Sequence, residues 1–166
     1  YKARLISPIR VNNGADFLQR FLPEFEKAEE KFGVPKEIIA AIIGIESSYG
    51  SITGRERVID SLSTLAFDYP RRSNFFTKQL EHFLLLAREE KLDAFSMKGS
   101  YAGAMGYGQF IPSSYRSYAI DFDNDGIRNI VTNPIDAIGS VANYLSKHGW
   151  EKNALIAEAL ERNDVT

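Results

Sequence analysis

Residues 35–50 read PKEIIAAIIGIESSYG. Pro35 suits the first turn of a helix, because its missing N–H would be unpaired there in any case. The residues that follow are apolar on nearly every side, which predicts a central, buried helix running to about Tyr49. Isoleucine would also suit a strand, but the alanines and the lack of alternation favour a helix. Glu46 is therefore an acid at the end of a buried apolar helix.

Glu46 is the first candidate for chemistry. An apolar environment disfavours the charged form of a carboxyl group and raises its pKa. A carboxylic acid that stays protonated near neutral pH can donate its proton to a leaving oxygen. From the pattern alone, a glutamate that simply reaches solvent at a helix end is at least as good an explanation.

Helical periodicity recurs along the rest of the chain. Apolar residues at helical spacing predict one amphipathic helix over residues 15–32. Ser73 is expected to cap a later helix, and Asn133 with Asp136 resembles a capping box at the start of the last one. Residues 96–108 are rich in glycine and are expected to form a loop. We therefore expect a single, mainly α-helical domain with few and short strands.

Composition narrows the possible functions. The chain has 166 residues, of which 44% are hydrophobic and 25% charged, as in one ordinary globular domain. The formal net charge is −2 and no long basic run occurs, so a nucleic-acid partner lacks its usual electrostatic footprint. The absence of cysteine excludes disulfides, thiolate metal sites and a cysteine nucleophile. No apolar run reaches membrane-spanning length.

Residues 99–112 read GSYAGAMGYGQFIP. Small residues let a backbone approach another surface closely. Ser100 and Gln109 supply hydrogen-bonding groups suited to sugar hydroxyls and N-acetyl groups, and Tyr101 and Tyr107 offer flat faces for sugar rings. A tight loop whose glycines serve only conformation is the alternative. A phosphate-binding loop is disfavoured, because no Gly-Lys-Ser/Thr follows.

Residues 121–127 read DFDNDGI, which matches the first half of an EF-hand calcium loop. The acid that normally closes such a loop is missing, because Thr132 stands there, and Asp136 lies four residues further on. We expect a structural calcium ion, since three crowded acids would repel one another without it. A metal-free Asp/Asn/Gly turn is the alternative. The expected ligands are Asp121, Asp123, Asp125, the carbonyl of Ile127, and Asp136.

Arg71 and Arg72 follow a proline turn. Such a pair can bind carboxylates of a peptide, although a solvated helix start explains it as well. His82 and His148 are isolated and are interpreted as ordinary helix residues. The sequence contains no serine-hydrolase elbow and no paired metal-binding histidines.

Several long strings, in this order, resemble the family of membrane-bound lytic murein transglycosylase B. They are residues 42–46, residues 67–72 (FDYPRR), residues 99–115, and residues 136–144 (DAIGSVANY) with the calcium loop before them. The resemblance covers nearly the whole chain. It implies a lysozyme-like catalytic domain over residues 1–166, with a glycan-binding cleft, as a fragment of a longer protein.

The resemblance also implies a reaction. Glu46 would protonate the oxygen of the β-1,4 bond between N-acetylmuramic acid (MurNAc) and N-acetylglucosamine (GlcNAc). It would then act as a base on the MurNAc C6 hydroxyl, which closes a 1,6-anhydro ring. Phe75 stands where the family has a tyrosine. The cleft residues implied are Ser100, Gln109, Arg71, Arg72, Tyr144 and Tyr1.

Two alternatives to this function remain. A glycoside hydrolase would need a second carboxylate, for which Asp60 and Asp68 are the only nominees. A non-catalytic, calcium-stabilised wall-binding module would need no catalytic acid. The expected partner is the peptidoglycan glycan strand rather than nucleic acid, and no cofactor is expected for the chemistry. We expect a periplasmic monomer, attached to the outer membrane only through a lipid anchor removed from this chain.

Overall fold

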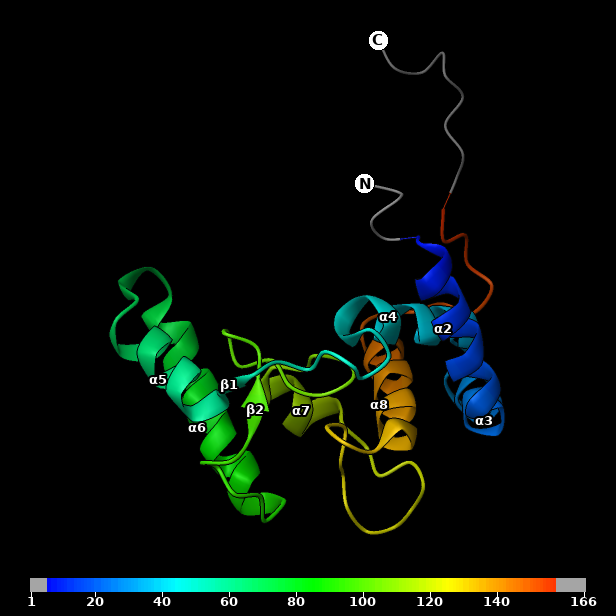
Figure 1. Cartoon of the computed structure of the whole chain (residues 1–166). Coiled ribbons are helices and arrows are strands. Elements are labelled where there is room, and N and C mark those ends of the chain that lie inside the picture. The colour runs from blue at the N-terminus through cyan, green and yellow to red at the C-terminus, as the bar shows by residue number, and fades with distance from the viewer. Residues whose placement is uncertain (1–5, 158–166) are drawn as a thin grey trace.

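The computed structural model describes residues 6–157, and these are mainly helical, as expected (Figure 1). The only two strands among them are two residues long each. No helix in this range is both long and apolar enough to cross a membrane. The elements in chain order are α2 (Pro8–Arg20), α3 (Leu22–Phe32), α4 (Lys36–Ser47), β1 (Glu56–Arg57), α5 (Val58–Phe67), η1 (Pro70–Arg72), α6 (Ser73–Glu89), β2 (Lys98–Gly99), α7 (Pro112–Tyr118) and α8 (Pro134–Lys147).

Helix α4 is the central element that its apolar sequence predicts. It packs against α2, α3 and α8, which are grouped around it in Figure 1. Ile39 and Ile43 are completely buried. Burying side chains of this kind contributes about 1.5–3 kcal/mol each before entropy is counted. The helix begins at Lys36, so Pro35 lies one position before the first helical residue.

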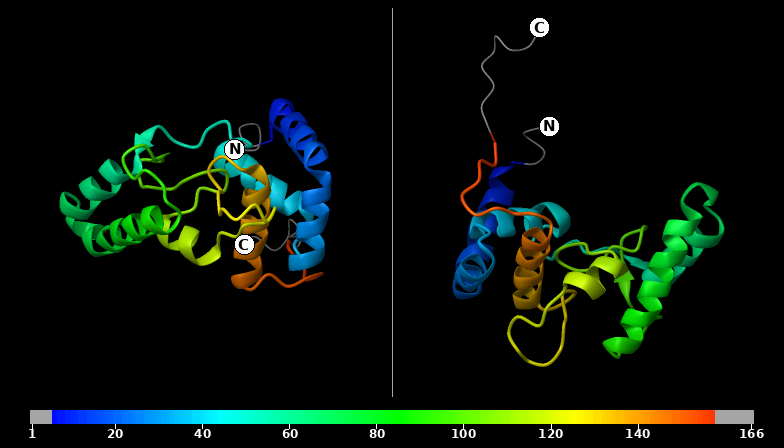
Figure 2. Two further views of the ribbon diagram at one scale, coloured as in Figure 1. Left: turned by 90° about the horizontal axis from the view of Figure 1, so that it is seen from below. Right: turned by 180° about the vertical axis from the view of Figure 1, so that it is seen from behind.

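Helices α5 and α6 form a second, separate unit, the α5–α6 pair. The two helices pack against each other, and Figure 2 shows them at one end of the molecule, away from α2 and α3. Helix α7 contacts both α6 and α8 and so joins the two parts. The short antiparallel pairing of Glu56 with Gly99, and of Arg57 with Lys98, fixes the segments that run between them.

The helix expected over residues 15–32 is two helices. Helix α2 begins earlier, at Pro8, where the Ser7 hydroxyl accepts a hydrogen bond from the Arg10 N–H at 3.2 Å. It ends before Phe21, and α3 begins at Leu22. Pro23 explains the break, because proline has no N–H to continue a helical ladder and its ring collides with the preceding turn.

The two predicted helix caps are only partly right. Asn133 caps α8 by accepting from the Ile135 N–H at 2.9 Å, but Asp136 turns away from the helix end. Ser73 is already helical and caps nothing; its hydroxyl donates to the Ala66 carbonyl instead. The 3₁₀ turn of Pro70–Arg72 before it supplies the change of direction that a capping residue would otherwise mark.

Two glycines admit the ring of Tyr49 between α2 and α4. A Cβ atom at Gly14 would lie 2.4 Å from the Tyr49 hydroxyl, and one at Gly44 would lie 2.5 Å from the same oxygen. The hydroxyl donates to the Arg10 carbonyl at 3.3 Å. The spacing of these two helices is therefore set by the thickness of one aromatic ring.

This packing predicts the effect of adding one methyl group. Gly44→Ala should lower the free energy of unfolding by about 1–3 kcal/mol, because the new methyl overlaps the Tyr49 ring. Chemical denaturation monitored by circular dichroism measures the loss. In a Tyr49→Leu background the overlap is gone, so the same substitution should become neutral or favourable, since alanine is the better helix former. An equal loss in both backgrounds would contradict the steric explanation.

Candidate functional site

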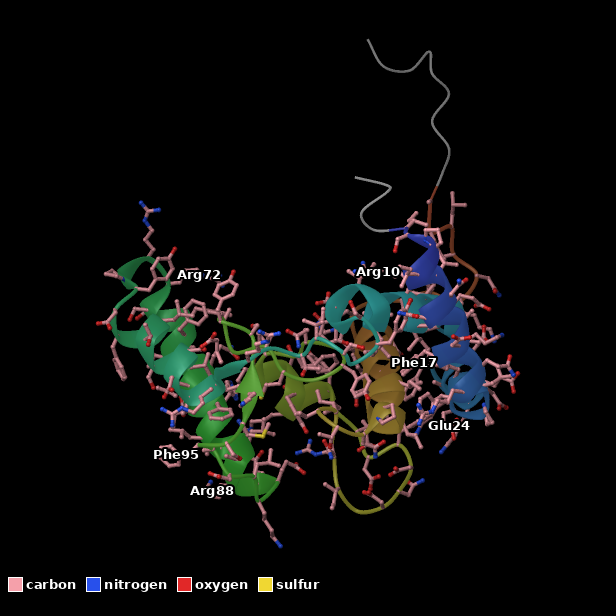
Figure 3. All side chains as sticks on the ribbon, in the orientation of Figure 1. Arg10, Phe17, Glu24, Arg72, Arg88 and Phe95 are labelled. Atoms are coloured by element: carbon pink, nitrogen blue, oxygen red, sulfur yellow. The ribbon has the colours of Figure 1, made fainter. Side chains whose placement is uncertain are left out.

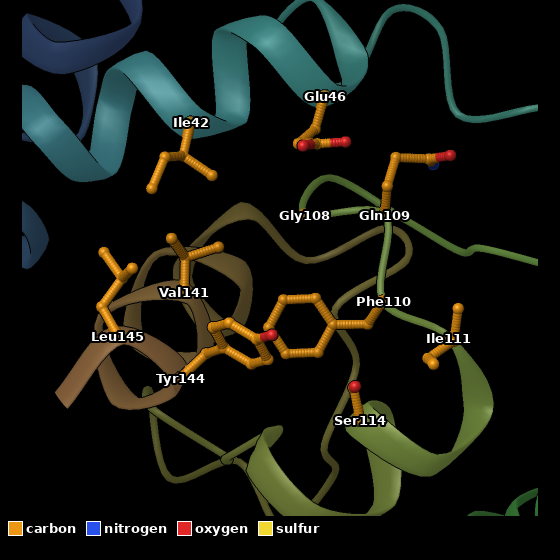
Figure 4. Close-up of a pocket in the computed structure, with 10 residues that line it drawn as sticks. All are labelled: Ile42, Glu46, Gly108, Gln109, Phe110, Ile111, Ser114, Val141, Tyr144 and Leu145. Carbon is orange, nitrogen blue, oxygen red and sulfur yellow. The ribbon is translucent and has the colours of Figure 1, made fainter. Parts of the chain in front are cut away.

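A pocket of about 420 Å³ lies beneath the C-terminal half of α4 (Figure 4). Its walls come from α4, from the loop that leads into α7, from α7 itself and from α8. Most of the lining is apolar, with few polar groups, as is usual for ligand sites. The lining residues are Ile42, Glu46, Gly108, Gln109, Phe110, Ile111, Ser114, Val141, Tyr144 and Leu145.

Glu46 projects from α4 into this pocket, above Gly108 and Gln109 (Figure 4). Its side chain is exposed to solvent on one side of the pocket, yet nearby protein atoms displace part of its water. That desolvation raises the pKa of the Glu46 carboxyl above its usual value, as expected. Among the described residues that line the pocket, Glu46 is the only acid. The arrangement is suited to proton donation by one carboxylic acid.

The other two nominated acids lie elsewhere. Asp60 belongs to α5, where its carboxylate accepts a hydrogen bond from the Arg57 side chain at 2.6 Å. Asp68 follows the end of α5 and is exposed. Neither lines the pocket with Glu46. The geometry gives no support to a paired-carboxylate hydrolase.

Ser47 fixes the end of α4 directly behind Glu46. Its side chain is 1% exposed, its Oγ lies 2.8 Å from the Tyr107 carbonyl, and it accepts from the Gly50 N–H at 2.9 Å. The next three residues, Ser48, Tyr49 and Gly50, all have positive φ. The chain therefore turns sharply after Glu46 and leaves that carboxyl group facing the pocket.

Gln109 and Ser100 both shape their own loop. The Gln109 side-chain amide donates to the Gly106 carbonyl at 2.9 Å and to the Thr53 carbonyl at 3.2 Å. The Ser100 hydroxyl accepts two backbone hydrogen bonds of its own turn. Gln109 lines the pocket beside Glu46, whereas Ser100 does not. The Gln109 carbonyl oxygen and the Ser100 O–H remain as groups suited to a ligand.

The other cleft residues that the sequence predicts are spread over the molecule. Tyr144 lines the pocket, and its ring lies 5.5 Å from that of Phe110. Arg71 and Arg72 are exposed in the turn at the tip of the α5–α6 pair, outside the pocket; Figure 3 shows Arg72 there. Tyr1 lies outside the described residues.

Phe75 stands where the resembled family has a tyrosine. Its ring makes a cation–π contact at the tip of the α5–α6 pair. The Arg72 guanidinium lies 4.4 Å from the centre of the Phe75 ring. A cation over an aromatic face is an attractive arrangement. Phenylalanine therefore has a structural role at this position without a hydroxyl.

Three of the predicted metal ligands come together. Carboxylate oxygens of Asp121, Asp123 and Asp136 lie within 4.8 Å of one another. Asp136 is completely buried, accepts from the Phe122 and Asn129 N–H groups at 2.7 Å each, and has its pKa raised by burial. These oxygens form a group of the kind that binds a hard cation.

Asp125, a fourth predicted acidic ligand, is not part of that group. The Asp125 carboxylate accepts from the Ile127 N–H at 2.8 Å. The part of Asp125 and of the Ile127 carbonyl in an ion site stays a prediction.

The sequence did not single out Ser47, Ser114, Val141 or Leu145. Val141 and Leu145 are four residues apart on α8, which predicts a shared face but not whether that face lies in the core or lines a pocket. Ser47 reads as part of a polar turn, and only its burial reveals that it holds the site together.

The chain matches a family model described as the transglycosylase SLT domain, over residues 1–164. It is 50% identical over 157 residues to membrane-bound lytic murein transglycosylase B of Escherichia coli (strain K12). That alignment covers 95% of this chain and 43% of the relative.

Solved structures of similar proteins share the fold. Soluble lytic transglycosylase SltB1 from Pseudomonas aeruginosa is 53% identical, with a TM-score of 0.92 over 93% of this chain and 52% of that one. Slt35 from Escherichia coli, in complex with calcium, is 50% identical, with a TM-score of 0.91 over 93% and 49%. SltB3 from Pseudomonas aeruginosa, in complex with NAG-anhNAM-pentapeptide, is 39% identical, with a TM-score of 0.87 over 92% and 40%. The chain thus spans about half, or less, of the length of these relatives.

The network around Ser47 predicts a stability effect close to the pocket. Ser47→Ala should cost about 1–3 kcal/mol of unfolding free energy, because it leaves the Tyr107 carbonyl and the Gly50 N–H without this partner. Denaturation in urea measures the change. Ser51→Ala, at an exposed serine in the same turn, is the matched control and should change stability by less than about 0.5 kcal/mol. A similar loss in both variants would show that the buried Ser47 hydroxyl contributes no more to stability than the exposed Ser51 hydroxyl.

Proposed function

We propose that this chain, which belongs to the transglycosylase SLT domain family, cleaves peptidoglycan glycan strands without consuming water. Membership of the family confirms the resemblance seen in the sequence. The activity proposed is cleavage of the β-1,4 bond between MurNAc and GlcNAc to leave 1,6-anhydro-MurNAc ends, in cell-wall turnover. Its main support is Glu46, the single partly desolvated acid in the pocket.

The relatives support both the reaction and its substrate. Three of them are named lytic transglycosylases or lytic murein transglycosylases. The SltB3 structure contains an anhydro-muropeptide, NAG-anhNAM-pentapeptide, which is the kind of product proposed here. This chain spans only part of those proteins. Their activity is therefore proposed for this chain and rests on its own residues as well. A periplasmic, monomeric enzyme follows as part of the same proposal.

The proposed reaction uses one carboxyl group twice. Protonated Glu46 donates its proton to the glycosidic oxygen as the bond from C1 to that oxygen breaks, and the raised pKa of Glu46 favours this starting form. The carboxylate then accepts the proton of the MurNAc C6 hydroxyl, whose oxygen bonds to C1 of the same sugar. Glu46 ends protonated again, and no water enters. Attack within one sugar gains from proximity.

Other pocket groups support binding of the strand. Gln109 and Tyr144 are proposed to contact the sugars on either side of the broken bond, since both line the pocket with Glu46. Ser100 is proposed to contact a sugar beyond the pocket. Arg71 and Arg72, exposed at the tip of the α5–α6 pair, are proposed to bind peptide carboxylates. Tyr1 remains a proposed cleft residue on the resemblance alone.

Glu46→Gln tests the central assignment. The amide keeps the size of the side chain but cannot supply the proton, so lysis of purified peptidoglycan should fall by about a hundredfold or more, while the variant still binds the glycan. Turbidity of a sacculus suspension measures lysis. The matched control is Glu37→Gln, which alters an exposed acid at the other end of α4 and should leave lysis unchanged.

The products decide between reaction classes. Mass spectrometry of the wild-type digest should show anhydro-MurNAc ends. New reducing ends would indicate a hydrolase, and undiminished lysis by Glu46→Gln would exclude Glu46 as the acid.

The converging acids support a structural calcium ion. Asp121, Asp123 and Asp136 offer oxygen atoms, which are the ligands a hard cation prefers, and the related Slt35 is known in complex with calcium. We assign Asp125 and the Ile127 carbonyl to the same ion on the EF-hand spacing. The ion would neutralise the crowded acids and would take no part in the chemistry.

Chelation tests the ion. Removing calcium with EDTA should lower the melting temperature, and added calcium should restore it, because an ion bound only by the folded protein stabilises it by mass action. Asp123→Asn should weaken this response. Asp68→Asn changes an exposed acid far from Asp123 in the sequence and should retain the response to calcium. If the melting temperature of the wild-type protein changes with neither EDTA nor calcium, the assignment of the ion is wrong.

A further inference from the structure

Tyr101 is an aromatic side chain that the folded chain leaves in solvent, with 79% of its surface exposed. The turn beneath it is nonetheless well fixed. The Ser100 N–H donates to the Ala104 carbonyl at 2.8 Å, and the Gly103 N–H donates to the Ser100 carbonyl at 2.9 Å. The Ser100 hydroxyl accepts from the Ala102 and Ala104 N–H groups at 3.2 and 3.1 Å. Four hydrogen bonds thus hold this short turn, while the Tyr101 side chain on it stays mostly in solvent.

The turn is also anchored to the rest of the molecule. Gly103, at a φ of 80°, packs against Leu62 of α5, where a Cβ atom would approach the leucine side chain to 2.6 Å. Gly99 at the other end pairs with Glu56 in the two-stranded sheet. Since this backbone is fixed before any ligand arrives, the entropy lost on binding to Tyr101 is small.

A continuous series of contacts joins the pocket to Tyr101. The Gln109 side chain donates to the Thr53 carbonyl at 3.2 Å. The next residue, Gly54, lies against the backbone of Gly99, since a Cβ atom there would come within 1.9 Å of the Gly99 carbonyl carbon. Gly99 precedes the turn that bears Tyr101. The segment 53–54 therefore connects the Gln109 side of the pocket to the foot of this turn.

We propose that Tyr101 is a stacking platform for one sugar ring of the bound glycan strand, outside the pocket that contains Glu46. The strand would leave the pocket past Gln109 and continue towards Tyr101. Ile42 and Leu145 lie at the other end of the pocket, as Figure 4 shows. The inference rests on the proposed function and extends it by naming a contact for a more distant sugar.

The surroundings of Tyr101 fit a sugar better than a protein partner. A stable protein interface buries roughly 1,200–2,000 Å², whereas one aromatic ring supplies about 150–250 Å². Its neighbours in the turn, Ser100, Ala102 and Gly103, carry no large apolar side chain that could widen an interface. A flat ring next to the O–H donor of Ser100 matches a sugar, which has an apolar face of C–H groups and a polar rim.

Binding of defined glycans to the Glu46→Gln protein tests the inference without cleavage. In this background, Tyr101→Ala should weaken binding of a peptidoglycan octasaccharide about tenfold, equal to about 1.4 kcal/mol, and leave binding of a disaccharide unchanged. Tyr101→Phe should bind as the parent does, since its ring remains. Phe95→Ala is the matched control: Phe95 is 67% exposed on the outer side of the α5–α6 pair (Figure 3) and should have no effect on either ligand.

The outcomes separate the inference from the proposed function. Equal octasaccharide affinity for Tyr101→Ala and the parent would overturn the stacking platform alone. So would an equal loss for octasaccharide and disaccharide, because a distant platform acts only on the longer ligand. A parent that binds neither glycan would overturn the proposed function, and the platform with it. Isothermal titration calorimetry measures the affinity of each protein for both glycans.

Discussion

The hydrogen bonds of the buried Ser47 hydroxyl are the constraint on which the site depends. They join the last turn of α4 to the Tyr107 carbonyl and to the Gly50 N–H, two groups on different segments. Ser47 faces the core, and the preceding residue, Glu46, faces the pocket. The hydrogen bond to the Tyr107 carbonyl also fixes the loop that contains Gln109. One small polar side chain in an apolar core thereby sets the relative position of the acid and its neighbour, which hydrophobic packing alone would leave loose.

The proposed reaction places two demands on the environment of Glu46. The apolar walls of the pocket remove water, which raises the pKa of the carboxyl group and favours the protonated acid. Complete burial would oppose donation of that proton, since the buried, unpaired carboxylate left behind is costly. The exposed edge of Glu46 permits both protonation states. A group that must act first as an acid and then as a base needs this intermediate environment, with its pKa near the working pH.

The sequence predicted the central position of α4, because a helix this apolar packs in the core, but it did not predict that Ile45 is 59% exposed. It failed over residues 15–32, where Pro23 interrupts a periodicity that was otherwise convincing. The pocket itself could not be predicted from the sequence, since Val141 and Leu145 come from a helix about a hundred residues after Glu46 in the chain. Periodicity gives the face of a helix, but only tertiary packing decides whether that face meets core or cavity.

The acidic loop meets the site through α8 and through the Ile130 carbonyl, which accepts from the Tyr107 N–H at 3.1 Å. Asp136 lies in the first turn of that helix and binds the Phe122 and Asn129 N–H groups, which closes the loop on itself. Tyr144, in the pocket, lies eight residues further on, about 12 Å along the helix axis at 1.5 Å per residue. An ion among these carboxylates is thus too far away to polarise the glycosidic bond. Its effect on the proposed reaction would be indirect. A loop under repulsion would loosen the start of α8, which forms one pocket wall, and the Ile130 carbonyl that holds Tyr107.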